Sequence, residues 1–61
     1  MKNRALLNRA MRTMKHHLDL AQSHVDFVIN ARGEFDEEYF LSYMEAIGEQ
    51  AGKIRETIQG E

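Results

Sequence analysis

The stretch RGEFDEEYF, residues 32–40, decides the predicted fold because it carries the end of one helix and the start of another. Asp36 can cap a helix N-terminus, and two glutamates follow in the first turn, where negative charge is favoured. Phe35 and Phe40 occupy the two positions of a hydrophobic staple across that cap. Gly33 is expected to end the preceding helix in the left-handed conformation. The stretch therefore predicts two helices joined by a short turn.

Apolar residues on both sides of this turn recur at alternating spacings of three and four residues. Such spacing is typical of the a and d positions of a helical heptad repeat. Before the turn the repeat comprises Leu7, Met11, Met14, Leu18, Ala21, Val25 and Val28. After the turn it comprises Phe40, Met44, Ile47, Ala51, Ile54 and Ile58. We expect these two rows to form the seam between the helices.

The 61 residues predict a single all-α domain, an antiparallel two-helix hairpin. Helix 1 is expected at about 4–32 with Asn3 as N-cap, the turn at 33–36 and helix 2 at about 37–59. Pairing outward from the turn places Leu18 opposite Ala51, although a register shifted by about half a turn stays open. The longer first helix should overhang at its N-terminus.

Further apolar or amphipathic side chains lie beside the seam, and one partner helix cannot cover so wide a surface. They are expected to form a dimer interface or a docking surface for another protein: Leu6, Leu20, Phe27, His17, His24, Tyr39 and Tyr43. A chain this short buries only about 60% of the surface that its unfolded form exposes, so its core is marginal without further reinforcement. We therefore expect two hairpins to pack as a homodimeric four-helix bundle.

The charge is unevenly distributed between the two halves of the chain. Residues 1–33 carry six basic and two acidic groups, and residues 34–61 carry two basic and eight acidic groups. The basic groups near the N-terminus are candidates for contacts with nucleic acid: Arg4, Arg9, Arg12 and Lys15. The competing expectation is that they pair with glutamates at 49, 56 and 61 of the antiparallel helix, and the net charge of −2 favours that expectation.

The sequence predicts neither an enzyme nor a bound metal or cofactor. It has no cysteine, no glycine-rich phosphate loop and no nucleophile beside a base. No two of its three histidines have the spacing of a helical metal pair. No apolar run approaches the roughly 20 residues of a membrane span, and the N-terminus does not read as a secretory signal. A cytoplasmic location is expected.

Two resemblances add to this prediction. The helical hairpin resembles, in architecture, the plasmid copy-control protein Rop. The segment ALLNRAMRTMKHHLDLAQ, residues 5–22, and the compact layout resemble the small accessory proteins of lambdoid phages encoded in the early exo–xis region. That resemblance implies a non-enzymatic protein that modulates host or phage regulation by binding other macromolecules. The expected function is thus a homodimeric interaction or regulatory module, with a nucleic-acid-binding hairpin as the alternative.

Overall fold

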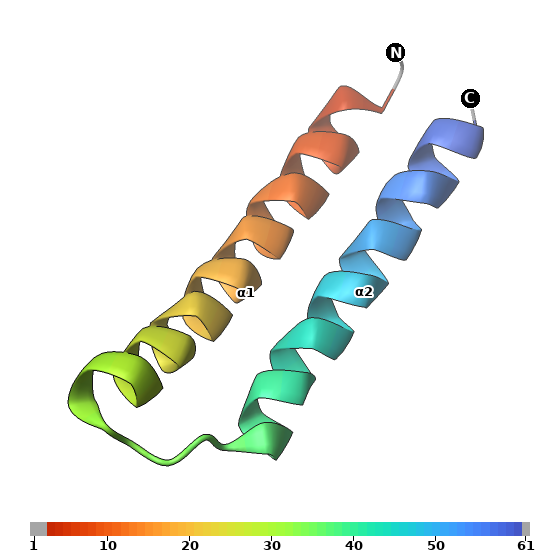
Figure 1. Cartoon of the computed structure of the whole chain (residues 1–61). Helices are drawn as coiled ribbons and strands as arrows, with labels where there is room; N and C mark the ends of the chain where they lie inside the picture. Colours follow the sequence, from red (N-terminus) through yellow and green to blue (C-terminus); the bar gives the residue numbers. More distant parts are fainter. Residues whose placement is uncertain (1–2, 61) are drawn as a thin grey trace.

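The computed structural model describes residues 3–60, and these form an antiparallel hairpin of two α-helices, which confirms the predicted fold class (Figure 1). Helix α1 spans Arg4–Ala31 and helix α2 spans Glu37–Gln59. The hairpin measures 46 × 16 × 10 Å between Cα extremes. Its smallest dimension is about the diameter of one helix, so the chain forms a single layer with two open sides.

The start of α2 is built as the sequence predicts. Asp36 has an extended backbone, and its carboxylate accepts a hydrogen bond from the Tyr39 N–H at 3.1 Å. The rings of Phe35 and Phe40 pack with their centroids 5.3 Å apart, which confirms the staple. The cap satisfies an N–H that has no partner within the helix, while the staple fixes the direction from which the chain enters α2.

The end of α1 differs from the prediction. Arg32 takes the left-handed conformation at φ 55° and ψ 34°, and no glycine has a positive φ. Gly33 serves a different purpose, because a Cβ atom there would overlap the ring of Phe27. At the other end of α1, Asn3 stands at the N-cap position but its side chain makes no capping hydrogen bond.

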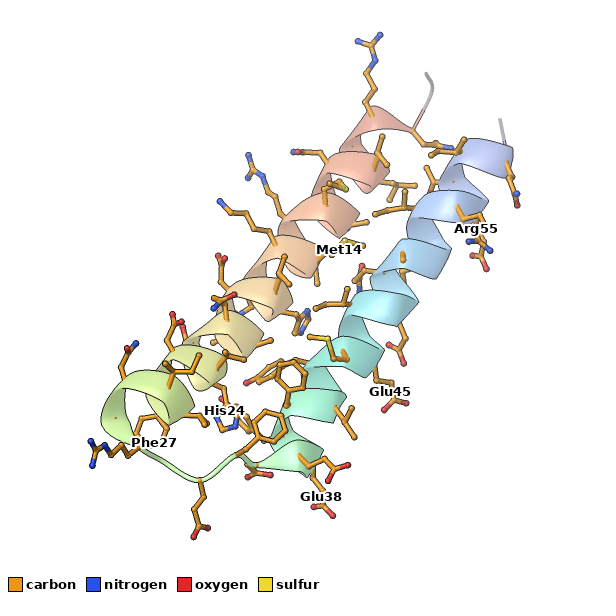
Figure 2. The ribbon with its side chains drawn as sticks, in the orientation of Figure 1. Met14, His24, Phe27, Glu38, Glu45 and Arg55 are labelled. Atoms are coloured by element: carbon orange, nitrogen blue, oxygen red, sulfur yellow. The ribbon has the colours of Figure 1, made fainter. Side chains whose placement is uncertain are left out.

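The seam between the helices is rotated from the predicted one. The only buried residues among those described are Ala10 and Ala21, and His17 and His24 are half-buried beside them. Ala21 belongs to the predicted seam, whereas Ala10, His17 and His24 form the row next to it. The heptad row that includes Leu18 is turned outward, because Ala10, His17 and His24 occupy its place against α2. Figure 2 shows Met14, from the row that both seams share, pointing toward α2.

The register also differs from the prediction. His24 Nε2 accepts a hydrogen bond from the Asp36 backbone N–H at 3.0 Å, and the rings of His17 and Tyr43 lie 6.0 Å apart. The first residue before α2 therefore lies beside His24, and α1 continues past it to Ala31. The overhang of α1 is thus at the turn and not at its N-terminus. The expected layer of Leu18 and Ala51 is absent from the seam, and both residues are exposed.

Replacing Phe40 with Ala should destabilise the hairpin, because Phe40 joins the staple to the seam. Phe40 is half-buried, so we expect a loss near the lower end of the range for buried aromatics, about 3 kcal/mol. Leu41→Ala is the matched control, since Leu41 is the next residue and is exposed; it should change stability by less than about 0.5 kcal/mol. Urea unfolding followed by circular dichroism measures both. Equal midpoints for the two variants would contradict the role given to Phe40.

Candidate interaction surfaces

One side of the hairpin carries a continuous series of aromatic contacts between α1 and α2. Ring centroids lie 6.0 Å apart for His17 and Tyr43, 4.8 Å for Tyr43 and Tyr39, and 5.2 Å for Tyr39 and His24. The Tyr43 hydroxyl donates to the Tyr39 hydroxyl at 3.0 Å, and His17 Nδ1 lies 3.0 Å from the Thr13 carbonyl oxygen. These contacts hold four polar-tipped rings in fixed positions along the seam.

We call this side of the hairpin the aromatic face. Its members are Leu6, His17, Leu20, His24, Phe27, Tyr39 and Tyr43. The structure brings most of these predicted interface residues together near the turn. His17, Leu20, His24 and Tyr43 are half-buried against the neighbouring helix, while Phe27 and Tyr39 are exposed. Leu6 lies fourteen positions before Leu20 on α1, so it extends the face toward the open end.

A shallow hollow opens in the aromatic face beside the turn. Its volume is about 370 Å³, and its lining consists of Leu20, Ser23, His24, Phe27, Asp36 and Tyr39. Figure 2 shows His24 and Phe27 on neighbouring turns of α1 next to the connection. Three apolar or aromatic walls and an acidic end give the hollow the character of a docking site for one side chain. Gly33 contributes indirectly, because its missing side chain leaves room for the Phe27 ring.

The opposite side of the hairpin carries a second apolar surface, which the sequence assigned to the seam. We call it the heptad face, and it consists of Met11, Leu18, Val25, Met44, Ala51 and Ile58. Val25 and Met44 are half-buried and the other four are exposed. The signal for this surface was present in the heptad pattern. Spacing alone does not say which partner an apolar row contacts, so the pattern predicts the row but not its place in the fold.

The predicted nucleic-acid contacts form a separate feature on α1. Arg4, Arg9, Arg12 and Lys15 are all exposed. Within residues 3–60 none of them forms an ion pair with an α2 glutamate, so the expected pairing with positions 49 and 56 is wrong; position 61 lies outside the described residues. Glu38, Glu45 and Arg55 point away from α1 in Figure 2. The basic groups therefore stay available to another molecule.

Neither a metal site nor a membrane span is apparent in the part of the chain that the structure describes. Among residues 3–60 no cluster of three or more histidines and carboxylates could hold a metal ion. Neither helix is apolar enough over its length to cross a bilayer. Comparison with protein-family models, curated proteins and solved structures found no match. The assignment of function therefore rests on the surfaces of the hairpin.

The hydrogen bond between the two tyrosines has a measurable consequence. It raises the pKa of Tyr43 above its ordinary value of 10.0, because Tyr43 donates to Tyr39 and would lose that bond on ionising; desolvation and the charge of an ionised Tyr39 act in the same direction. In the Tyr39→Phe variant the acceptor is gone but the ring remains. We expect the pKa of Tyr43 to fall toward 10.0, as followed by NMR of the Tyr43 ring.

The same shift fixes the direction of the pH dependence of stability. A phenol whose pKa is higher in the folded state contributes stability that is fully present below pH 10 and is lost as the pH rises through the folded pKa. The parent protein should therefore lose more stability above pH 10 than Tyr39→Phe does. An unchanged titration of Tyr43 in the variant would show that the hydrogen bond does not form in solution.

Proposed function

We propose that this chain is a non-catalytic interaction module that acts as a homodimer and docks a protein partner on its aromatic face. The observation that carries the proposal is the apolar surface left open on both sides of a single-layer hairpin. Among the described residues of the hairpin only Ala10 and Ala21 are buried, while nine large apolar side chains are exposed. Apolar surface of this extent is typical of interaction sites in small proteins.

The aromatic face suits the partner better than it suits a catalytic role. Its hollow offers apolar walls at Leu20 and Phe27 and a carboxylate at Asp36. An amphipathic helix of the partner could place an apolar side chain in the hollow and a neighbouring basic side chain beside the carboxylate of Asp36. The hydroxyls and imidazoles nearby bond to one another or to backbone atoms, an arrangement that stabilises the face rather than activating a nucleophile.

The resemblance of residues 5–22 to phage accessory proteins extends this proposal to regulation. A homodimer that docks a second protein can act by occupying that protein's surface or by holding two copies of it together. Regulation of a host or phage process in the host cytoplasm would need no more than this, and we include such a role in the proposal.

Partner docking is tested with two single-residue variants. Phe27 is 54% exposed and lies on the aromatic face, and Ile29 is 69% exposed two residues away but faces a different side of α1. Phe27→Ser should abolish capture of the partner from host extract, with and without nuclease, while Ile29→Ser should retain it. Circular dichroism checks that both variants keep the helical content of the parent. Equal capture by both variants would contradict docking at the aromatic face.

A nucleic-acid-binding hairpin is the second candidate. The observation that favours it is that the basic side chains of α1 form no ion pair within residues 3–60. Binding of this kind should weaken with salt, with a log–log slope near −0.9 for each phosphate neutralised on duplex DNA. We expect no shift of duplex DNA or RNA at micromolar protein and physiological ionic strength, because the chain is acidic overall. A shift that is lost on changing Arg9 and Arg12 to Gln would replace the first proposal by the second.

A further inference from the structure

The heptad face has the geometry of half a four-helix bundle. The histidine–tyrosine contacts lie on one flank of the seam, so the heptad rows of α1 and α2 share the other flank. Residues seven apart lie almost in line along a helix, and the hairpin therefore presents two adjacent apolar rows on this side. Both rows lie next to positions already packed in the seam. A second pair of helices placed on them would continue the same heptad packing.

The α1 part of the heptad face includes a hollow that can receive side chains from such a second layer. It has a volume of about 340 Å³ and is lined by Met11, Arg12, Met14, Lys15 and Leu18. The three apolar members form its walls, and the two basic residues lie along its rim. A leucine or methionine at the corresponding position of a facing helix is the kind of side chain that fills a hole of this type.

The exposed area of the chain agrees with one missing contact of ordinary size. The chain exposes 4967 Å², whereas a compact monomer of 7.1 kDa is expected to expose about 4,100 Å². The excess of about 900 Å² is close to the roughly 800 Å² that each partner buries in a standard protein interface. A second hairpin on one side of the layer would remove an area of this size.

The charge distribution along the hairpin determines which way round a second copy fits. The turn half, residues 18–46, carries seven acidic groups and one basic group, a net charge of −6. The open half, residues 3–17 and 47–60, carries six basic groups and two acidic groups, a net charge of +4. Two copies with their turns at the same end would place the acidic halves together. Two copies with their turns at opposite ends place each acidic half against a basic half.

We propose that the heptad face is covered by the heptad face of a second copy, with the two turns at opposite ends of the bundle. The inference rests on the homodimer of the proposed function and adds its interface and orientation. A twofold axis perpendicular to the helices then sets α1 antiparallel to α1 of the second copy. The basic residues of one α1 lie beside Asp19 and Asp26 of the other. The aromatic face stays open on both outer sides of the bundle, where it can dock two partner molecules.

A matched pair of leucine variants tests the interface. Leu18 on the heptad face is 53% exposed and Leu6 on the aromatic face is 52% exposed, so a charge at either position leaves the hairpin itself intact. The parent should sediment at about 14 kDa, twice the 7.1 kDa of one chain, at micromolar concentration. Leu18→Glu should sediment as the 7.1 kDa monomer and Leu6→Glu as the dimer. A Leu18→Glu variant that stays dimeric would overturn the interface.

The orientation is tested by a distance between the two turns. The chain has no cysteine, so Glu34→Cys, at an exposed turn position, provides one site for a nitroxide label. Pulsed electron paramagnetic resonance should give a distance comparable with the 46 Å length of the hairpin. Turns at the same end would give about 10–25 Å, since neighbouring helix axes lie about 10 Å apart, and would overturn the orientation alone. A parent protein that sediments as a monomer would instead overturn the homodimer of the proposed function.

Discussion

The contact between Asp36 and His24 is the constraint on which the arrangement of this hairpin depends. Asp36 caps α2 through its carboxylate and donates its own backbone N–H to the imidazole of His24 on α1. One residue therefore fixes where α2 begins and at which level of α1 it begins. The imidazole also packs between the rings of Phe35 and Tyr39, which orients α1 about its own axis. Register and rotation are set together at the turn.

That rotation explains why apolar surface remains on both sides. With His24, His17, Ala10 and Ala21 directed at α2, small and polar-tipped side chains share the seam with half-buried apolar ones such as Met14 and Phe40. Helices in contact through alanine can approach closely, and the large aliphatic residues on their flanks then lie outside the contact. The hairpin thus leaves nine large apolar side chains exposed, while only two alanines among the described residues are buried. The proposed dimer and the proposed partner site both depend on this rotation of α1.

Local features of the fold could be predicted from the sequence because they depend on residues close together in the chain. The Asp36 cap and the Phe35–Phe40 staple follow from spacing within a single turn of helix, and the short connection makes the two helices antiparallel. The seam could be predicted only in part, because a heptad repeat reports all the apolar contacts of a helix without dividing them among partners. The rows of Met14 and Phe40 belong to the seam, whereas the row of Leu18 lies beside it. A histidine is also a poor signal for a seam position. His24 belongs to the seam through the N–H that Asp36 donates to it and through its contacts with the rings of Phe35 and Tyr39. The left-handed residue at position 32 was missed because arginine does not favour that conformation.

Connection of the helices by one short turn has a consequence for how the protein reaches its folded state. Every contact between α1 and α2 closes a loop around that turn, and the pairs nearest to it, such as His24 with Asp36, are only twelve residues apart. Chains dominated by such local contacts fold in microseconds to milliseconds. Each hairpin should therefore form on its own shortly after synthesis, starting from the capped and stapled end of α2. For the proposed dimer, association with a second chain would be a slower step, and its extent would depend on the protein concentration.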